Sequence, residues 1–168
     1  ELVLLNSNQK YNSTQQIRAI EILKEKFSGV SVPMANKLSG HQDPEVRARA
    51  IWGLGAITFN QQEVELFDHY LLDLKPVVLY QTLQRLRNES PSEQVLKKIS
   101  PGLIAPLGSS DRFTRQSAIQ VVSPHADHLN SILTNYLKGL PHQVVQRVKL
   151  SLAAARLQQN KNDSTLDA

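Results

Sequence analysis

The residues best suited to metal chemistry lie in the segment SPHADHLN, at residues 123–130. His125 and His128 are three residues apart, so both imidazoles could share one face of a helix, with Asp127 beside them. A zinc site would need a third ligand from another element, and further groups to orient the ligands. We therefore expect solvent-exposed or capping histidines here, and no bound metal. The remaining histidines follow no ligand pattern: His41, His69 and His142.

A second possible chemistry is the binding of anions by arginine. Arg47 and Arg115 occupy matching places in two similar segments, and a guanidinium can bind a phosphate or a carboxylate in a bidentate manner. Each arginine follows an aspartate by four residues, Asp43 and Asp111 respectively. Residues four apart meet on the surface of a helix. We therefore expect each arginine to pair with the aspartate of its own or the adjacent segment, in a structural role.

Signatures of catalysis are absent from the sequence. The chain has no cysteine, which excludes thiolate nucleophiles, cysteine-based zinc sites and covalent haem attachment. It has no Gly-x-Ser-x-Gly, no His-Glu-x-x-His and no glycine-rich phosphate loop. The stretch GLGAI at residues 53–57 lies inside a helical pattern with no strand before it, so it does not predict dinucleotide binding. We expect no enzymatic activity and no cofactor in this segment.

Charge is spread unevenly along the chain, whose formal net charge is +4. Residues 100–160 carry six Lys or Arg against two Asp or Glu. Residues 61–73, in contrast, contain four Asp or Glu and no Lys or Arg. The basic second half could attract a polyanion such as nucleic acid. Solubility alone also accounts for an excess of this size, so both interpretations stay open.

Membrane insertion is not expected. No apolar run approaches the roughly 20 residues that a membrane span requires. The segment ELVLLNSNQK has no basic region before its short apolar stretch, so it does not predict a signal peptide. The missing initiator Met favours a processed chain or a fragment of a larger protein.

Similar segments recur along the chain and position the residues named above. NSTQQIRAIEIL at residues 12–23 aligns with DPEVRARAIWGL at residues 43–54, an offset of 31 residues. DRFTRQSAIQVV repeats the pattern 68 residues after the second copy, and KPVVLYQTLQRL and PHQVVQRVKLSL supply two further copies. Periods of roughly 30–36 residues indicate an array of helical units.

Each unit is predicted to contain two helices, the first of which begins at Asn, Asp, Ser or Pro, residues that suit a helix start. Apolar residues then recur at intervals of three and four residues, which is typical of a helix. No run of alternating β-branched residues predicts a strand. The fold class is therefore all-α. The second helices are predicted at residues 31–39, 61–73, 92–106 and 126–138. Residues 1–160 form one array with units at about 12–40, 43–73, 75–107, 110–139 and 141–158, and residues 161–168 form a polar tail.

A small residue recurs beside a branched one in the first helices. Ala19, Ala50 and Ala118 each precede an isoleucine. A small side chain lets a neighbouring helix approach closely, while the branched residue beside it fills the groove. Units of this kind bury their apolar faces only by stacking on one another.

The segment DPEVRARAIWGLGAI resembles the first helix of a HEAT repeat. The matching residues are Asp43, Pro44, Val46, Arg47, Ala50 and Leu54. The sequence departs from the family pattern at Thr114, where an aliphatic residue is usual, and at Gln16 and Leu79, which replace the arginine. The resemblance covers about residues 12–158. It implies an armadillo-like architecture, a right-handed α-α superhelix (solenoid) of four to five helical hairpins.

A second similarity concerns the larger context. LGSSDRFTRQSAIQVV is similar to repeats in large bacterial multidomain proteins that join a sugar-dehydrogenase-like propeller, HEAT-like repeats and a c-type cytochrome. This similarity implies the repeat portion of an exported, periplasmic protein. A cytoplasmic protein is the alternative.

The resemblance to HEAT repeats implies a binding or scaffolding function, with contact residues on the second helices, which line the inner surface of such arrays. The expected partner is another protein or another domain of the same parent chain. The alternative is binding of nucleic acid or another polyanion through the basic second half. The expected partner-binding residues are Glu65, His69, Lys97, Lys98, Asn130 and Lys138.

Overall fold

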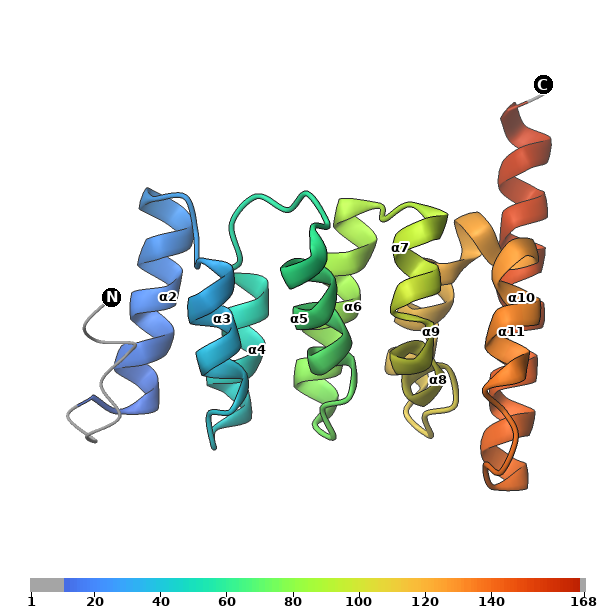
Figure 1. Cartoon of the computed structure of the whole chain (residues 1–168), viewed down its shortest axis with the longest axis horizontal. Coiled ribbons are helices and arrows are strands. Elements are labelled where there is room, and N and C mark those ends of the chain that lie inside the picture. The colour runs from blue at the N-terminus through green and yellow to red at the C-terminus, as the bar shows by residue number, and fades with distance from the viewer. Residues whose placement is uncertain (1–10, 167–168) are drawn as a thin grey trace. The chain divides into compact units, whose positions relative to one another are not determined.

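The computed structural model describes the backbone of residues 11–166 and the side chains of residues 11–161. All regular secondary structure in this part of the chain is helical, as Figure 1 shows, so the all-α prediction is confirmed. The helices are α2 (Ser13–Lys26), α3 (Val32–Ser39), α4 (Pro44–Trp52), α5 (Gln61–Leu71), α6 (Pro76–Glu89), α7 (Glu93–Lys98), α8 (Ser100–Leu107), α9 (Arg112–Val122), the 3₁₀ helix η1 (Ser123–His125), α10 (Ala126–Asn135) and α11 (His142–Leu166).

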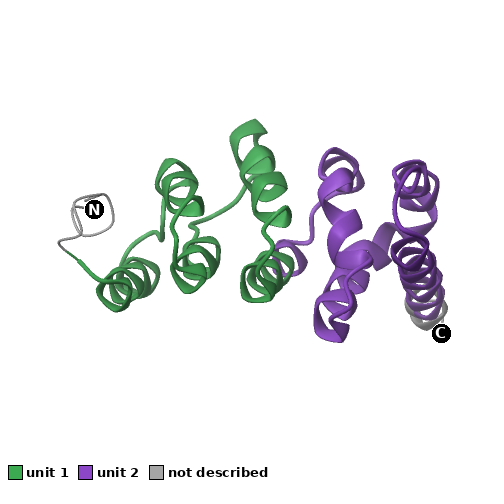
Figure 2. Cartoon of the chain, turned by 90° about the horizontal axis from the view of Figure 1, so that it is seen from below, with its two compact units in different colours: residues 1–85 green, residues 86–168 purple. Residues whose placement is uncertain are grey.

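The helices form hairpins that are divided between two compact units, residues 1–85 and residues 86–168 (Figure 2). In the first unit, helices in the same place of successive hairpins pack side by side, α2 on α4 and α3 on α5, while α3 also packs on α4. In the second unit α9 packs on α11, and α10 packs on α7, α8 and α11. Each unit therefore buries its apolar residues between hairpins as well as within them.

Polar caps start the first helices at the predicted residues. Asp43 accepts a hydrogen bond from the amide of Glu45 (2.9 Å), and Asp111 accepts one from the amide of Thr114 (2.6 Å). This amide contact is the main reason why the pKa of Asp111 lies below its usual value. Asn12 and Gln15 bond reciprocally at the start of α2. Such caps satisfy amides that have no partner within the helix.

The small residues are buried in two of the three copies. Ala50 and Ala118 are fully buried, whereas Ala19 is half-buried. In that first copy the neighbouring Ile20 is fully buried and supplies the core residue.

The helix predicted at residues 92–106 is broken in two, and α7 ends at Lys98 before α8 begins at Ser100. Pro101 has no amide hydrogen to donate to the carbonyl four residues earlier, and its ring crowds that carbonyl. The hydroxyl of Ser100 donates to the carbonyl of Leu96 (2.8 Å) at the break.

The last helix is longer than predicted. α11 continues through Leu166, into residues that were expected to form a polar tail.

Arg47 has a different partner from the expected Asp43. Its Nε and Nη2 atoms donate to the two carboxylate oxygens of Asp73, at 2.7 and 3.1 Å, and its Nη1 donates to the carbonyls of His41 (2.6 Å) and Gln42 (3.2 Å). Asp43 is engaged at the helix start, whereas Asp73 lies in the turn after α5 and reaches the guanidinium. The expected pair of Arg47 with Asp43 is therefore wrong.

Arg115 repeats the backbone contacts of Arg47 but makes no carboxylate contact in the described structure. Its Nη1 donates to the carbonyls of Ser109 and Ser110, both at 2.8 Å, which lie six and five residues earlier, as do the carbonyls bound by Arg47. The expected pair of Arg115 with Asp111 is also not formed, because the carboxylate of Asp111 caps α9. Both arginines fasten the loop before a first helix to that helix.

Two loops of the first unit approach each other at backbone distance. The amide of Val30 donates to the carbonyl of Gly53 (2.8 Å), and the amide of Gly55 donates to the carbonyl of Val30 (3.0 Å). Gly29, in the same loop, has a φ of +89°, a conformation that favours glycine. A Cβ at residue 55 would collide with the carbonyl oxygen of Ser28, which is main chain and cannot turn away. The close approach of the first two hairpins thus requires glycine at position 55.

We predict that Gly55→Ala lowers the free energy of unfolding of the first unit by about 2–3 kcal/mol, because the added methyl must push the two loops apart. Gly40→Ala is the matched control. A Cβ there meets only the carbonyl of Lys37 at 4.0 Å, so we expect a change within about 0.5 kcal/mol. Denaturant unfolding followed by the fluorescence of Trp52, the only tryptophan in the chain, measures both. Equal stabilities of the two variants would contradict the close approach.

We predict that Arg47→Met costs the first unit about 2–4 kcal/mol, because the side chains of Arg47 and Asp73 are only 12% and 13% exposed and the carboxylate loses its main donor. The control is Arg18→Met, which breaks an exposed pair with Glu21 and should change stability by less than about 0.5 kcal/mol.

The same pair predicts a pH dependence. Burial raises the pKa of Asp73, but the hydrogen bonds from Arg47 and Lys75 and the charge of Arg47 outweigh burial, so the pKa lies below its usual value. A depressed native pKa contributes stability above about pH 4, the usual pKa of aspartate, and this contribution is lost as the pH falls through the native pKa. The free energy of unfolding, measured from pH 6 to pH 2, should therefore fall less steeply in Arg47→Met than in the wild type. Parallel curves would show that Asp73 does not depend on Arg47.

Candidate interaction surface

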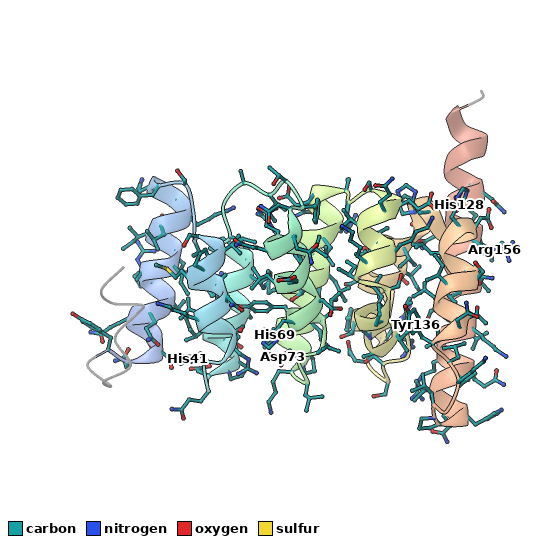
Figure 3. The ribbon with its side chains drawn as sticks, in the orientation of Figure 1. His41, His69, Asp73, His128, Tyr136 and Arg156 are labelled. Atoms are coloured by element: carbon teal, nitrogen blue, oxygen red, sulfur yellow. The ribbon has the colours of Figure 1, made fainter. Side chains whose placement is uncertain are left out.

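The predicted partner-binding residues of the first unit lie on one exposed side of α5. Glu65 and His69 are four residues apart and both exposed, and Glu65 accepts a hydrogen bond from the Nε2 of Gln61 (2.7 Å). The ring of His69, which is labelled in Figure 3, meets the ring of Tyr70 edge-on. The two ring centroids are 6.3 Å apart. Tyr70 itself is buried and donates to the carbonyl of Ala35 (2.9 Å), so it fixes α5 on α3.

Two exposed leucines follow α5 and were not predicted as contact residues. Leu72 is 60% exposed and Leu74 is 92% exposed, on either side of Asp73. Since Asp73 is held by Arg47, the turn that carries both leucines is fixed to α4. The pattern Leu-Asp-Leu directly after a helix could have indicated them in the sequence.

Asp68, between Glu65 and His69, is half-buried, and its Oδ1 atom has no hydrogen-bond partner in the described structure. Burial raises the pKa of Asp68, and the nearby charge of His69 offsets this effect only in part. The ionised carboxylate of Asp68 therefore lowers the stability of α5. Glu63 is the opposite case, because one of its carboxylate oxygens accepts from the amide and hydroxyl of Thr58 and from the amide of Asn60, at 2.9–3.1 Å.

In the second unit, a carboxylate on α7 connects two helices. Glu93 pairs with Lys97 on the same helix and with the Nδ1 of His128 on α10, at 3.1 Å. The hydrogen bond from Lys97 and the charge of His128 hold the pKa of Glu93 below its usual value. Lys98, the neighbouring predicted residue, is exposed. Figure 3 labels His128, near the start of α10, and Tyr136, directly after its end.

The other predicted residues of this unit lie further along the chain. Asn130 is half-buried on α10, and its carbonyl accepts from the hydroxyl of Thr134 (2.6 Å). Lys138 is exposed in the turn after α10. α10 packs on α7, but among the described residues no hydrogen bond or ion pair joins Asn130 or Lys138 to Lys97 or Lys98.

The histidines of the SPHADHLN segment have different surroundings. His128 contacts Glu93, whereas His125 is half-buried and lines a cavity of about 60 Å³ beside Arg87 and Gln120. A cavity of that size holds a few water molecules at most and is far smaller than the usual pocket of an organic ligand. Asp127 pairs instead with Arg156 of α11, at 2.6 Å. Within residues 11–161, no group of three or more His, Cys, Asp or Glu side chains is placed to hold a metal ion.

The net charge of the chain resides in the second unit. Residues 1–85 carry nine Lys or Arg and nine Asp or Glu, whereas residues 86–168 carry ten and six. Arg115 and Arg147 donate to main-chain carbonyls, Arg147 to that of Gly108 at 2.7 Å. Their charge is therefore held in place but is not neutralised by these contacts.

Comparisons with known proteins find no matching family model, no matching curated protein and no matching solved structure. None of the helices in the described part of the chain has the length and apolar character needed to cross a membrane.

We predict opposite effects of removing the charge from the two contrasting acids of α5. Asp68→Asn should leave the stability unchanged or raise it by up to about 0.5 kcal/mol at pH 7, because the amide carries no desolvated charge. Glu63→Gln should cost about 1–3 kcal/mol, because the carboxylate accepts three hydrogen bonds while buried. Unfolding followed by Trp52 fluorescence compares the two. A larger loss for Asp68→Asn than for Glu63→Gln would contradict this account of α5.

Proposed function

We propose that the chain is an array of HEAT-like helical hairpins, a right-handed α-α superhelix of four to five units. In this proposal the array is a non-catalytic binding or scaffolding module within a larger protein. Its partner is another protein or another domain of the same parent chain.

Repetition of the contacts at first helices supports the array. Asn12, Asp43 and Asp111 cap equivalent helices, and Arg47 and Arg115 bind carbonyls at the same two distances along the chain. In each unit, helices of successive hairpins pack on one another. These regularities favour repeated units over unrelated helices, because a stacked array reuses one set of end contacts.

One observation carries the binding function. Second helices expose side chains of varied chemistry in each of the two units: an acid and a histidine on α5 in the first unit, and two lysines on α7 in the second. Charged side chains on a protein surface chiefly fix the orientation of a partner and speed encounter.

Polyanion binding is the second candidate, and the location of the net charge favours it. The excess positive charge belongs to residues 86–168, and Arg115 and Arg147 keep theirs. Two other cations, Lys97 and Arg156, are paired with acids, which weakens the attraction for phosphate. For this reason we rank protein binding ahead of polyanion binding in this proposal.

The experiment uses the full chain and the variant Lys97→Glu/Lys98→Glu. Affinity capture first identifies a binding protein, and surface plasmon resonance then measures its association with wild type and variant. We expect association about tenfold slower at low ionic strength, with an unchanged circular dichroism spectrum, because exposed charges contribute little to stability. The control, Arg18→Glu/Lys26→Glu on the first helix α2, should associate at the wild-type rate.

Three results would contradict the proposal. If the double reversal unfolds the protein, the two lysines pack within the array. If both variants associate at the wild-type rate, the partner binds elsewhere. If the wild type binds DNA or heparin tightly at physiological salt, the polyanion candidate replaces protein binding, since non-specific phosphate contacts weaken steeply with salt.

A further inference from the structure

The last helix has two different faces. Val148, Leu152 and Ala155 are at most 2% exposed and form the inner face of α11, within the second unit. On this side, the hydroxyl of Ser151 donates to the carbonyl of Leu107 (2.9 Å) and Arg147 donates to that of Gly108. The inner face thus accounts for the packing of α11 on its own unit.

The outer face of α11 carries a second, exposed apolar stripe. Leu150 is 69% exposed and Leu157 is 64% exposed, and Gln146, Ala153 and Asn160 between and beside them are exposed as well. These five residues follow one another at spacings of four, three, four and three. That is the spacing of the a and d positions with which one α-helix packs along another. Ala153, at the centre, permits a close approach.

Two large leucines on one helix face, each about two-thirds exposed, are unusual for a surface that meets only water. Grouped apolar residues with a polar rim mark places where another molecule packs. The regular spacing suits an α-helix as that molecule, because apolar residues at alternating intervals of four and three form the seam along which two helices pack.

The charges beside the stripe specify its chemistry. Lys149 and Arg156 lie on one side of it and Lys161 on the other, and α11 has no acidic residue before Asp163. Arg156 pairs with Asp127, whereas Lys149 has no acidic partner among the described residues. Pairing α11 with a second copy of itself would place these cations against one another, which costs energy.

We propose that the outer face of α11 is a docking site for an amphipathic α-helix whose apolar stripe is flanked by acidic residues. Leu150 and Leu157 pack against the apolar side chains of that helix, and Ala153 sets the distance between the two helix axes. Lys149 faces an acidic flank of that helix and helps to orient it. This site lies on a first helix, apart from the second-helix residues of the proposed function, and does not depend on them.

The test uses the full chain and two synthetic, fluorescein-labelled helical peptides of equal length. Both have Leu at the a and d positions, and they differ only in carrying Glu or Lys at the flanking positions. Fluorescence anisotropy at low salt should show binding of the Glu peptide, at least tenfold tighter than that of the Lys peptide. Leu150→Ser/Leu157→Ser should weaken binding of the Glu peptide at least tenfold, with an unchanged circular dichroism spectrum because both leucines are exposed.

Two further variants separate this site from other surfaces. Leu72→Ser/Leu74→Ser, which removes two exposed leucines from the first unit, should bind the Glu peptide as the wild type does. Lys149→Glu should weaken the Glu peptide about threefold and strengthen the Lys peptide, and it keeps the proposal testable if the double serine variant fails to fold.

Several results would overturn the proposal. Equal affinity for both peptides would remove the charge complementarity, and unchanged binding by the double serine variant would place the peptide elsewhere. Dimerisation of the wild type in analytical ultracentrifugation, abolished by Leu157→Ser, would show that a second copy covers the stripe instead. A second-helix variant such as Lys97→Glu/Lys98→Glu should not affect the peptide, so failure here is distinguishable from failure of the proposed function.

Discussion

Short helices joined by tight turns leave many carbonyl groups without an amide donor, and in this protein lysine, arginine and serine side chains supply the missing donors. An α-helix leaves four carbonyls unpaired at its end, and carbonyls in the turn that follows need donors as well, so a chain of short hairpins faces this cost repeatedly. Arg47 and Arg115 bind the carbonyls that precede their own helices. Lys24 and Arg85 bind those of Leu54 and Gly55, 30 residues away in each case.

The same requirement links the hairpins to one another. A donor that reaches 30 to 44 residues along the chain joins one hairpin to the next, as Lys24, Arg147 and Ser151 do. The glycines at positions 53, 55 and 108 let these neighbours come close, since a Cβ at any of them would overlap an adjacent group. The need for donors to main-chain carbonyls also explains where positive charge remains without an acidic partner. Arginines that bind carbonyls keep their charge in a fixed place, while several of the exposed cations, such as Lys97 and Arg156, have acidic partners.

Much of the fold could be predicted from the sequence, because caps and apolar spacing act locally. The helix starts at Asp43 and Asp111 and the all-helical class follow from such signals. Contacts between distant segments could not be predicted in the same way. Nothing near Arg47 in the sequence indicates Asp73, 26 residues later, whereas Asp43 at four residues is the obvious and wrong choice. Pro101 is a local signal for the break at Ile99, but the apolar residues on both sides of it favoured one continuous helix.

The candidate surfaces show the same division. Exposure of Glu65, His69, Lys97 and Lys98 was predictable from helical periodicity, and so was the pair of Glu93 with Lys97, four residues apart. The contact of Glu93 with His128 was not predictable, since it depends on tertiary packing. The outer stripe of α11 is visible in the sequence as Leu150, Ala153 and Leu157. It was missed because Val148 and Leu152 already accounted for the helix as a core element.

The role of the carbonyl-binding arginines is the central claim, and Arg115 tests it most directly because it binds main-chain carbonyls and no carboxylate in the described structure. The measurement is native-state hydrogen exchange of the α9 amides in Arg115→Met and in Arg112→Met, an exposed neighbour on the same helix. We predict a loss of about 1–3 kcal/mol in the free energy of opening for Arg115→Met and less than about 0.5 kcal/mol for Arg112→Met. Equal protection in the two variants would contradict the claim that these side chains hold the hairpin loops.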